Sequence, residues 1–264
     1  MKACGILDKM PVRLSEPVEY FLQLGTETFA MNEMLGHKLR LTFTGNIFCT
    51  VCGRKTSKSF GEGLCYPCFE NSPENSPCII HPELCEAHLG RGRDPEWEKT
   101  HHLQPHFVYL ALTGAVKVGV TRSSQIPTRW IDQGAASAII LAETPYRQLA
   151  GQIEVALKQH LTDKTNWLHI LRNHTISIDL VSEKLRVSKL LPEPLQAYVT
   201  ANHDIVTLQY PVNEYPEKVT SISLDKVPQF DLTLTGIRGQ YLIFEGGKVI
   251  NIRRHSGYEV ELTV

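Results

Sequence analysis

Alternation of hydrophobic and polar residues predicts β-strands at both ends of the chain. Residues 39–44 alternate apolar with polar side chains, as a half-buried strand does, and Gly45 is expected to end this strand. Residues 241–252 predict two further strands joined by a glycine turn. The sequence at 41–45 resembles that at 232–236, so we expect both chain ends to contribute strands to one discontinuous β-module.

A β-hairpin is predicted in the middle of the chain, where two runs of alternating apolar and polar residues flank the turn 113–115. Matching their apolar faces pairs Leu110 with Val118. This register places Tyr109 opposite Gly119 on the other face of the hairpin. The small glycine leaves room for a substrate to approach that face.

After the hairpin the apolar residues take up helical spacing. Pro127 and Gly134 bracket a short helix, and residues 138–141 predict a buried strand. From about Pro145 an apolar stripe predicts a longer helix, and residues 166–171 predict a last short one. Together with the hairpin, the order is strand, strand, helix, strand, helix, helix.

These patterns divide the chain into four segments and predict a multidomain α+β fold. Its 264 residues also favour more than one module, because domains usually have ~100–200 residues. The segments are 1–48, the N-terminal strands of the β-module; 49–106, a cysteine- and histidine-rich insert; 107–175, the strand and helix segment; and 176–264, a β-rich C-terminal region.

Composition and charge narrow the possible classes of protein. Hydrophobic residues make up 42% and charged residues 21%, which is typical of a globular chain. No apolar run approaches the ~18 residues of a membrane span, and the start lacks a signal peptide, so we expect a cytoplasmic protein without a membrane partner. Only the segment 107–175 is clearly basic, with seven lysines and arginines against four acidic residues. A phosphate-facing site is therefore expected there first.

Two CxxC pairs predict a zinc ribbon. In a reducing compartment cysteines favour metal binding over disulfides, and two pairs separated by twelve residues can close a tetrahedron of four thiolates. The expected ligands of this structural Zn²⁺ are Cys49, Cys52, Cys65 and Cys68.

A second, less regular cluster follows the ribbon. Cys78, Cys85 and His88 are expected to ligate a second zinc ion, because thiolate and imidazole are both good zinc ligands. The alternative is a proline-rich loop with buried cysteines and surface histidines. Three other residues could replace the histidine ligand: His101, His102 and His106.

Four residues of the basic segment carry a resemblance to a known family. Tyr109 lies on the first strand, Lys117 precedes a glycine on the paired strand, Arg129 lies on the next helix, and Glu154 lies on the helix after the third strand. In this order the segment resembles a GIY-YIG nuclease domain, with a ββαβαα arrangement. Lys117 replaces the second tyrosine of that family, and the first motif lacks its glycine. The chain as a whole resembles a bacterial family of unknown function.

The resemblance implies catalysis on nucleic acid, DNA or RNA. Tyr109 would relay a proton from water, Lys117 would contact phosphate, and Arg129 would stabilise charge on the phosphate. Glu154 would bind the catalytic Mg²⁺ or Mn²⁺. The expected activity is metal-dependent hydrolysis of a phosphodiester.

Two other functions fit the same residues. The domain could bind nucleic acid, possibly structured RNA, without cleaving it, or the zinc modules could be scaffolds of a protein-interaction adaptor whose partners the sequence leaves unknown. In both cases Tyr109 is a packed aromatic residue, and Glu154 pairs with Lys158 on one helix face.

Overall fold

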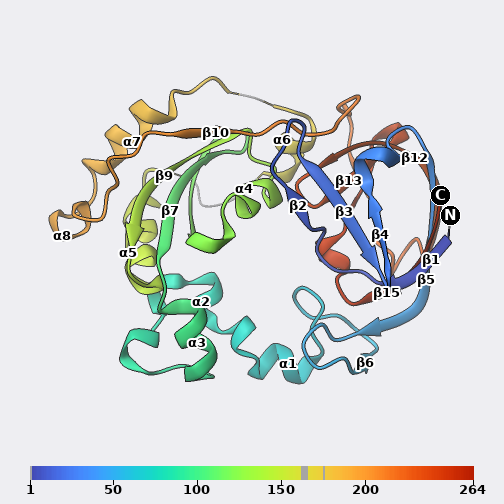
Figure 1. The fold of residues 1–264 in the computed structure, drawn as a ribbon, viewed down its shortest axis with the longest axis horizontal. Helices are drawn as coiled ribbons and strands as arrows, with labels where there is room; N and C mark the ends of the chain where they lie inside the picture. The colour runs from blue at the N-terminus through green and yellow to red at the C-terminus, as the bar shows by residue number, and fades with distance from the viewer. Residues whose placement is uncertain (1, 162–165, 175) are drawn as a thin grey trace. The chain divides into compact units, whose positions relative to one another are not determined.

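The computed structural model describes residues 2–161, 166–174 and 176–264 (Figure 1). The chain divides into two compact units. Unit 1 comprises Met1–Glu70, Leu171–Asn173 and Leu208–Val264, and unit 2 comprises Asn71–Ile170 and His174–Thr207. The ribbon cysteines therefore belong to the unit that contains both chain ends.

Unit 1 is built on an eight-stranded sheet and a three-stranded sheet. The path of the large sheet is β1 (Lys2–Ile6), β15 (Tyr258–Thr263), β5 (Lys38–Phe48), β12 (Gln229–Arg238), β13 (Tyr241–Phe244), β14 (Lys248–Asn251) and β11 (Thr220–Ser221), with β6 (Lys55–Thr56) paired to β5. The small sheet contains β2 (Val12–Arg13), β3 (Glu19–Leu24) and β4 (Glu27–Ala30). The unit also contains most of α1 (Tyr66–Asn71) and the 3₁₀ turns η1 (Met31–Met34), η6 (Glu245–Gly247) and η7 (Arg253–His255).

Strands from both chain ends share the large sheet, as the sequence predicted. Leu39 of β5 lies opposite Leu232 of β12, and β1 lies beside β15 (Figure 1). The expected end of the strand at Gly45 is wrong, because β5 continues to Phe48. Gly45 has a φ of 86°, and the pairing of β5 with β15 shifts register around it. It therefore forms an irregularity inside the strand, which the missing side chain permits.

Unit 2 is built on a four-stranded antiparallel sheet. Its order is β10 (Ile205–Thr207), β9 (Ser137–Thr144), β7 (His106–Leu112) and β8 (Val116–Arg122). The predicted hairpin register is confirmed: Leu110 lies opposite Val118, and Tyr109 lies opposite Gly119. The expected order of strands and helices is present, and β10 extends the sheet beyond what the sequence predicted.

Helices cover this sheet and fill the cysteine-rich segment. Those around the sheet are η5 (Ser123–Gln125), α4 (Thr128–Asp132), α5 (Arg147–Leu157), α6 (Trp167–Leu171), α7 (Leu180–Ser188) and α8 (Glu193–Gln196). The insert contains α1 (Tyr66–Asn71), η2 (Pro73–Asn75), α2 (Pro77–Ile80), η3 (Pro82–Leu84), η4 (Ala87–Leu89) and α3 (Pro95–His102). Helices α7 and α8 stand where strands were expected. In the described ranges, no helix has both the length and the apolar character needed to cross a membrane.

The core of unit 2 lies between the apolar face of the sheet and two helices. Val108 and Val118 pack there with Ile153 of α5 and Val187 of α7. Helix α4 lies on the opposite side of the sheet from α5 (Figure 1). Tyr109 and Lys117 alternate with the core residues and thus belong to the α4 side.

Candidate functional site

The four ribbon cysteines form a cluster that can bind a metal such as zinc. Cys49 and Cys52 lie on the turn that follows β5, and Cys65 and Cys68 lie at the start of α1. All four sulfur atoms are within 4.8 Å of one another. Two sulfurs of a tetrahedral zinc site are about 3.8 Å apart, given Zn–S bonds of about 2.3 Å. Cys52 Sγ and Cys65 Sγ are 3.7 Å apart, which matches the separation of two sulfurs on one zinc ion.

Backbone hydrogen bonds shape the two cysteine turns. The Gly53 amide donates to the Cys49 carbonyl at 2.9 Å, and the Phe69 amide donates to the Cys65 carbonyl at 2.9 Å. Burial alone would raise the pKa of the Cys49 thiol, but hydrogen bonds from the backbone of Cys52 and Cys65 lower this pKa to about 6. A thiol with a lowered pKa is ready to bind metal as a thiolate.

A second cluster joins Cys78, Cys85 and His102. All three are buried, and their ligand atoms lie within 4.8 Å of one another. The structure does not bring the expected His88 into this group: its ring stacks on Tyr146 with centroids 4.8 Å apart. His102, one of the possible replacements, takes its place at the end of α3.

The Tyr109 ring packs against the neighbouring strand at Gly119. A Cβ atom at Gly119 would be 2.6 Å from the Tyr109 hydroxyl oxygen, so only glycine leaves room for the ring. The hydroxyl donates to Gln133 Oε1 at 2.9 Å, and Trp130 contacts the ring edge-on. Tyr109 is fully buried. The hairpin and α4 therefore fix this phenol in one position.

The three charged residues predicted to act with Tyr109 differ in exposure. Arg129 of α4 is half-buried, whereas Lys117 of β8 and Glu154 of α5 are buried. Burial raises the pKa of Tyr109, the Arg129 charge and the Gln133 hydrogen bond partly oppose this rise, and the Glu154 charge adds to it. Arg129 and Glu154 thus both act electrostatically on one phenol. Because its pKa is raised, Tyr109 is neutral at neutral pH and can donate a proton or a hydrogen bond.

Glu154 belongs to a different layer from Tyr109. Its helix packs on the apolar face of the sheet, whereas Tyr109 and Lys117 lie on the other face. Glu154 Oε2 lies 3.7 Å from Lys158 Nζ, one turn along the helix. The ion pair foreseen from the sequence is therefore present. A cation at Glu154 would find one carboxylate there, which is enough for Mg²⁺ only when substrate oxygens and water supply the other ligands.

The contacts of two residues at these sites were not predicted from the sequence. Gln133 lies four residues after Arg129, so helical spacing would have placed both on one face of α4. Arg147 is partly buried at the start of α5 and donates to the carbonyls of Cys78 and Ile79, at 3.0 and 2.9 Å. No local pattern signals Arg147, because its partners are almost seventy residues away.

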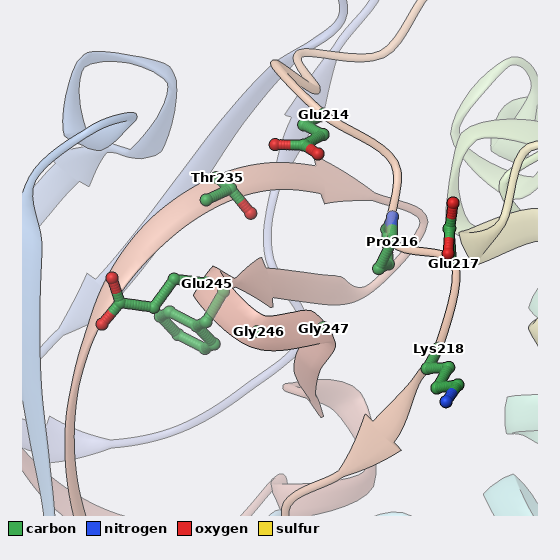
Figure 2. Close-up of a pocket in the computed structure, with 9 residues that line it drawn as sticks. Glu214, Pro216, Glu217, Lys218, Thr235, Glu245, Gly246 and Gly247 are labelled. Carbon is green, nitrogen blue, oxygen red and sulfur yellow. The ribbon is translucent and has the colours of Figure 1, made fainter.

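Unit 1 contains a hollow of about 430 Å³ beside β12 and η6. Three carboxylates line it, those of Glu214, Glu217 and Glu245. Figure 2 shows that the Glu245 carboxylate points away from Glu217, so these acidic groups do not converge on one point. Among the described residues they form no group of possible metal ligands.

Comparison with known proteins gives one result. No curated protein and no solved structure matches the chain. A family model covers residues 36–260, which is most of both units. The chain therefore belongs to the family described as protein of unknown function (DUF2797).

Proposed function

We propose that the protein processes nucleic acid by metal-dependent hydrolysis of a phosphodiester in unit 2. The observation that carries this proposal is geometric: Tyr109 and Lys117 lie on one face of the hairpin, and the α4 segment that carries Arg129 contacts the phenol through Gln133 and Trp130. Tyrosine, arginine and glutamate, in this order, occupy corresponding positions in the GIY-YIG nuclease domain that the segment resembles. The four-cysteine ribbon in unit 1 would be a structural zinc site.

Each residue has a role that follows from its surroundings. Arg129 is half-buried and would bind a phosphate oxygen as the substrate arrives. Tyr109 would donate its hydrogen bond to the phosphate in place of Gln133, because a phenol with a raised pKa is a donor at neutral pH. Lys117 would add positive charge on the same face of the sheet. Glu154 would hold Mg²⁺ or Mn²⁺, which supplies charge neutralisation at the phosphate.

A second candidate function is binding of nucleic acid without cleavage. The burial of Tyr109 favours it, since a fully buried hydroxyl that already donates to Gln133 has no contact with a water nucleophile. The Lys158 ion pair likewise occupies part of the Glu154 carboxylate. In this case Arg129 would still bind phosphate.

Substitution of Glu154 separates the two candidates. Labelled single-stranded, duplex and structured DNA and RNA are incubated with the zinc-loaded protein and Mg²⁺ or Mn²⁺. We expect Glu154→Gln to abolish cleavage and to retain binding, because the substitution removes the carboxylate charge with little change of shape. Glu143→Gln is the matched control, since Glu143 is an exposed glutamate of β9 in the same unit.

The outcomes are distinct. Cleavage by wild type and Glu143→Gln, but not by Glu154→Gln, supports hydrolysis. Salt-sensitive binding with no cleavage by any of the three proteins supports the non-catalytic function. Cleavage that persists in Glu154→Gln contradicts the role of Glu154.

A further inference from the structure

The second cysteine cluster has the dimensions of a metal site. His102 Nδ1 lies 3.5 Å from Cys85 Sγ and 4.0 Å from Cys78 Sγ. A sulfur and a nitrogen bound to one tetrahedral zinc ion are about 3.6 Å apart, given Zn–S of about 2.3 Å and Zn–N of about 2.0–2.1 Å. The imidazole nitrogen thus faces both sulfurs at the separation that a shared ion requires.

The segment around this cluster has only a small apolar core of its own. Its local buried group consists of Cys78, Cys85 and Ala87. Larger apolar side chains nearby are exposed, among them Ile80 at 74% and Leu84 at 58%. Short helical turns with so small an apolar core are stable in proteins when a metal or disulfide links them.

The cluster also lies against α5. Arg147 binds the carbonyls of Cys78 and Ile79 through its guanidinium group. One turn further along α5, a Cβ at Gly151 would be 2.1 Å from the Glu83 amide nitrogen, so η3 packs directly on the helix backbone. Arg147 and Gly151 therefore join the segment of Cys78 and Cys85 to the helix that carries Glu154.

We propose that Cys78, Cys85 and His102 bind a zinc ion of their own, separate from the ribbon ion, which fixes this segment on α5. Thiolates and imidazole together select zinc over Mg²⁺ or Ca²⁺. Within the described part of the chain, these three residues form the group, which leaves the fourth position of a tetrahedral site for a solvent molecule. Cys78, which is 8% exposed, lines a hollow of about 230 Å³, and this is the side from which a solvent ligand would approach.

Two adjacent histidines provide the test. His102 belongs to the cluster, whereas its neighbour His101 stacks on Trp97 outside it. Elemental analysis of protein purified without added metal should give two zinc ions per chain in wild type and in His101→Ala, but one in His102→Ala. His102→Cys should restore two, because a third thiolate can take the position of the imidazole.

The outcomes that overturn the proposal are equally direct. One zinc ion in wild type, or two in His102→Ala, would exclude this ligand set, and iron in place of the second zinc would exclude the choice of metal. Alkylation of the wild-type protein tests the proposal even if a variant does not fold. Alkylation after denaturation with a chelator should modify all seven cysteines; only five modified cysteines, with Cys78 and Cys85 protected, would indicate a disulfide instead.

Discussion

At the level of single residues, Gly119 decides where the Tyr109 ring can lie. The ring crosses the backbone of β8 at this glycine and contacts Trp130 of α4. Both aromatic residues are buried, so the ring cannot turn outwards without leaving a cavity. The glycine expected to open the face for a substrate instead accommodates the phenol of the same domain.

Gly119→Ala should therefore destabilise the protein. The added methyl group would lie 2.7 Å from Tyr109 Cζ, and overpacking of this kind costs about 1–3 kcal/mol. The free energy of unfolding in urea measures the loss. In a Tyr109→Leu background the same substitution should cost less, because the ring that it meets is gone. An equal cost in both backgrounds would contradict the contact.

The ligands of the second cluster show how far residue-level prediction reaches. Cys78 and Cys85 could be named from their spacing, but the choice between His88 and His102 depends on how α3 folds back. Asp94 caps this helix by accepting from the Trp97 amide, and His102 ends it beside the cysteines. Spacing in the sequence favours His88, which is nearer to the two cysteines. The path of the chain through α3 instead brings His102 to them.

At the level of elements, apolar alternation predicted the hairpin and its register because one face of it is buried. Helix α7 was not predicted, although Asp179 caps its N-terminus by accepting a hydrogen bond from the Val181 amide at 3.0 Å. Its face toward the sheet contains the buried Lys184, whose amino group donates to Thr200 Oγ1. Lys184 interrupts the apolar stripe on the inner face of α7. The hydrophobic pattern alone therefore does not predict this helix.

One contact between elements predicts a pH dependence. Tyr258 of β15 donates its hydroxyl to Asp225, at 3.0 Å, in the turn that precedes β12. Burial, and then the Asp225 carboxylate, raise the pKa of Tyr258 to about 12. An unfolded tyrosine has a pKa of about 10, so the unfolded chain releases this proton first as the pH rises. The stabilisation is fully present below pH ~10 and declines between about pH 10 and 12.

Unfolding free energies measured from pH 8 to pH 11.5 test this expectation. The unfolding free energy of wild type should fall above pH ~10. The Tyr258 hydroxyl should contribute at most about 1.4 kcal/mol per pH unit to this fall. Tyr258→Phe should start less stable and lose less over the same range. Tyr66→Phe, at an exposed tyrosine, should keep the wild-type slope. Equal slopes for wild type and Tyr258→Phe would contradict the assignment.

At the level of the whole molecule, each unit has its own β-structure and its own cysteine cluster. The ribbon follows β5 in unit 1, and the cluster of Cys78, Cys85 and His102 lies in unit 2. This arrangement could not be predicted from the order of motifs, because both clusters fall within one cysteine-rich stretch of sequence. The boundary between the units passes between them, next to Asn71.

If each cysteine cluster binds a metal, loss of the metal from one cluster should therefore loosen the unit that contains it and leave the other unit protected. Metal-binding energy stabilises the elements that the ligands organise, and hydrogen exchange reports the opening of such elements separately. Cys65→Ser should increase amide exchange in β5 and β15, whereas Cys85→Ser should increase it in α5 and β7. Cys4→Ser is the control, because Cys4 is exposed on β1 and outside both clusters.

Exchange followed by mass spectrometry on the three variants distinguishes separate from shared stabilisation. If both ions supported a single cooperative structure, either cysteine substitution would raise exchange throughout the chain by a similar factor. Separate stabilisation instead predicts a change confined to one unit, with the exchange of the other unit equal to that of Cys4→Ser. An effect of Cys85→Ser on β5 as large as its effect on α5 would contradict this division, because no ligand of that cluster belongs to unit 1.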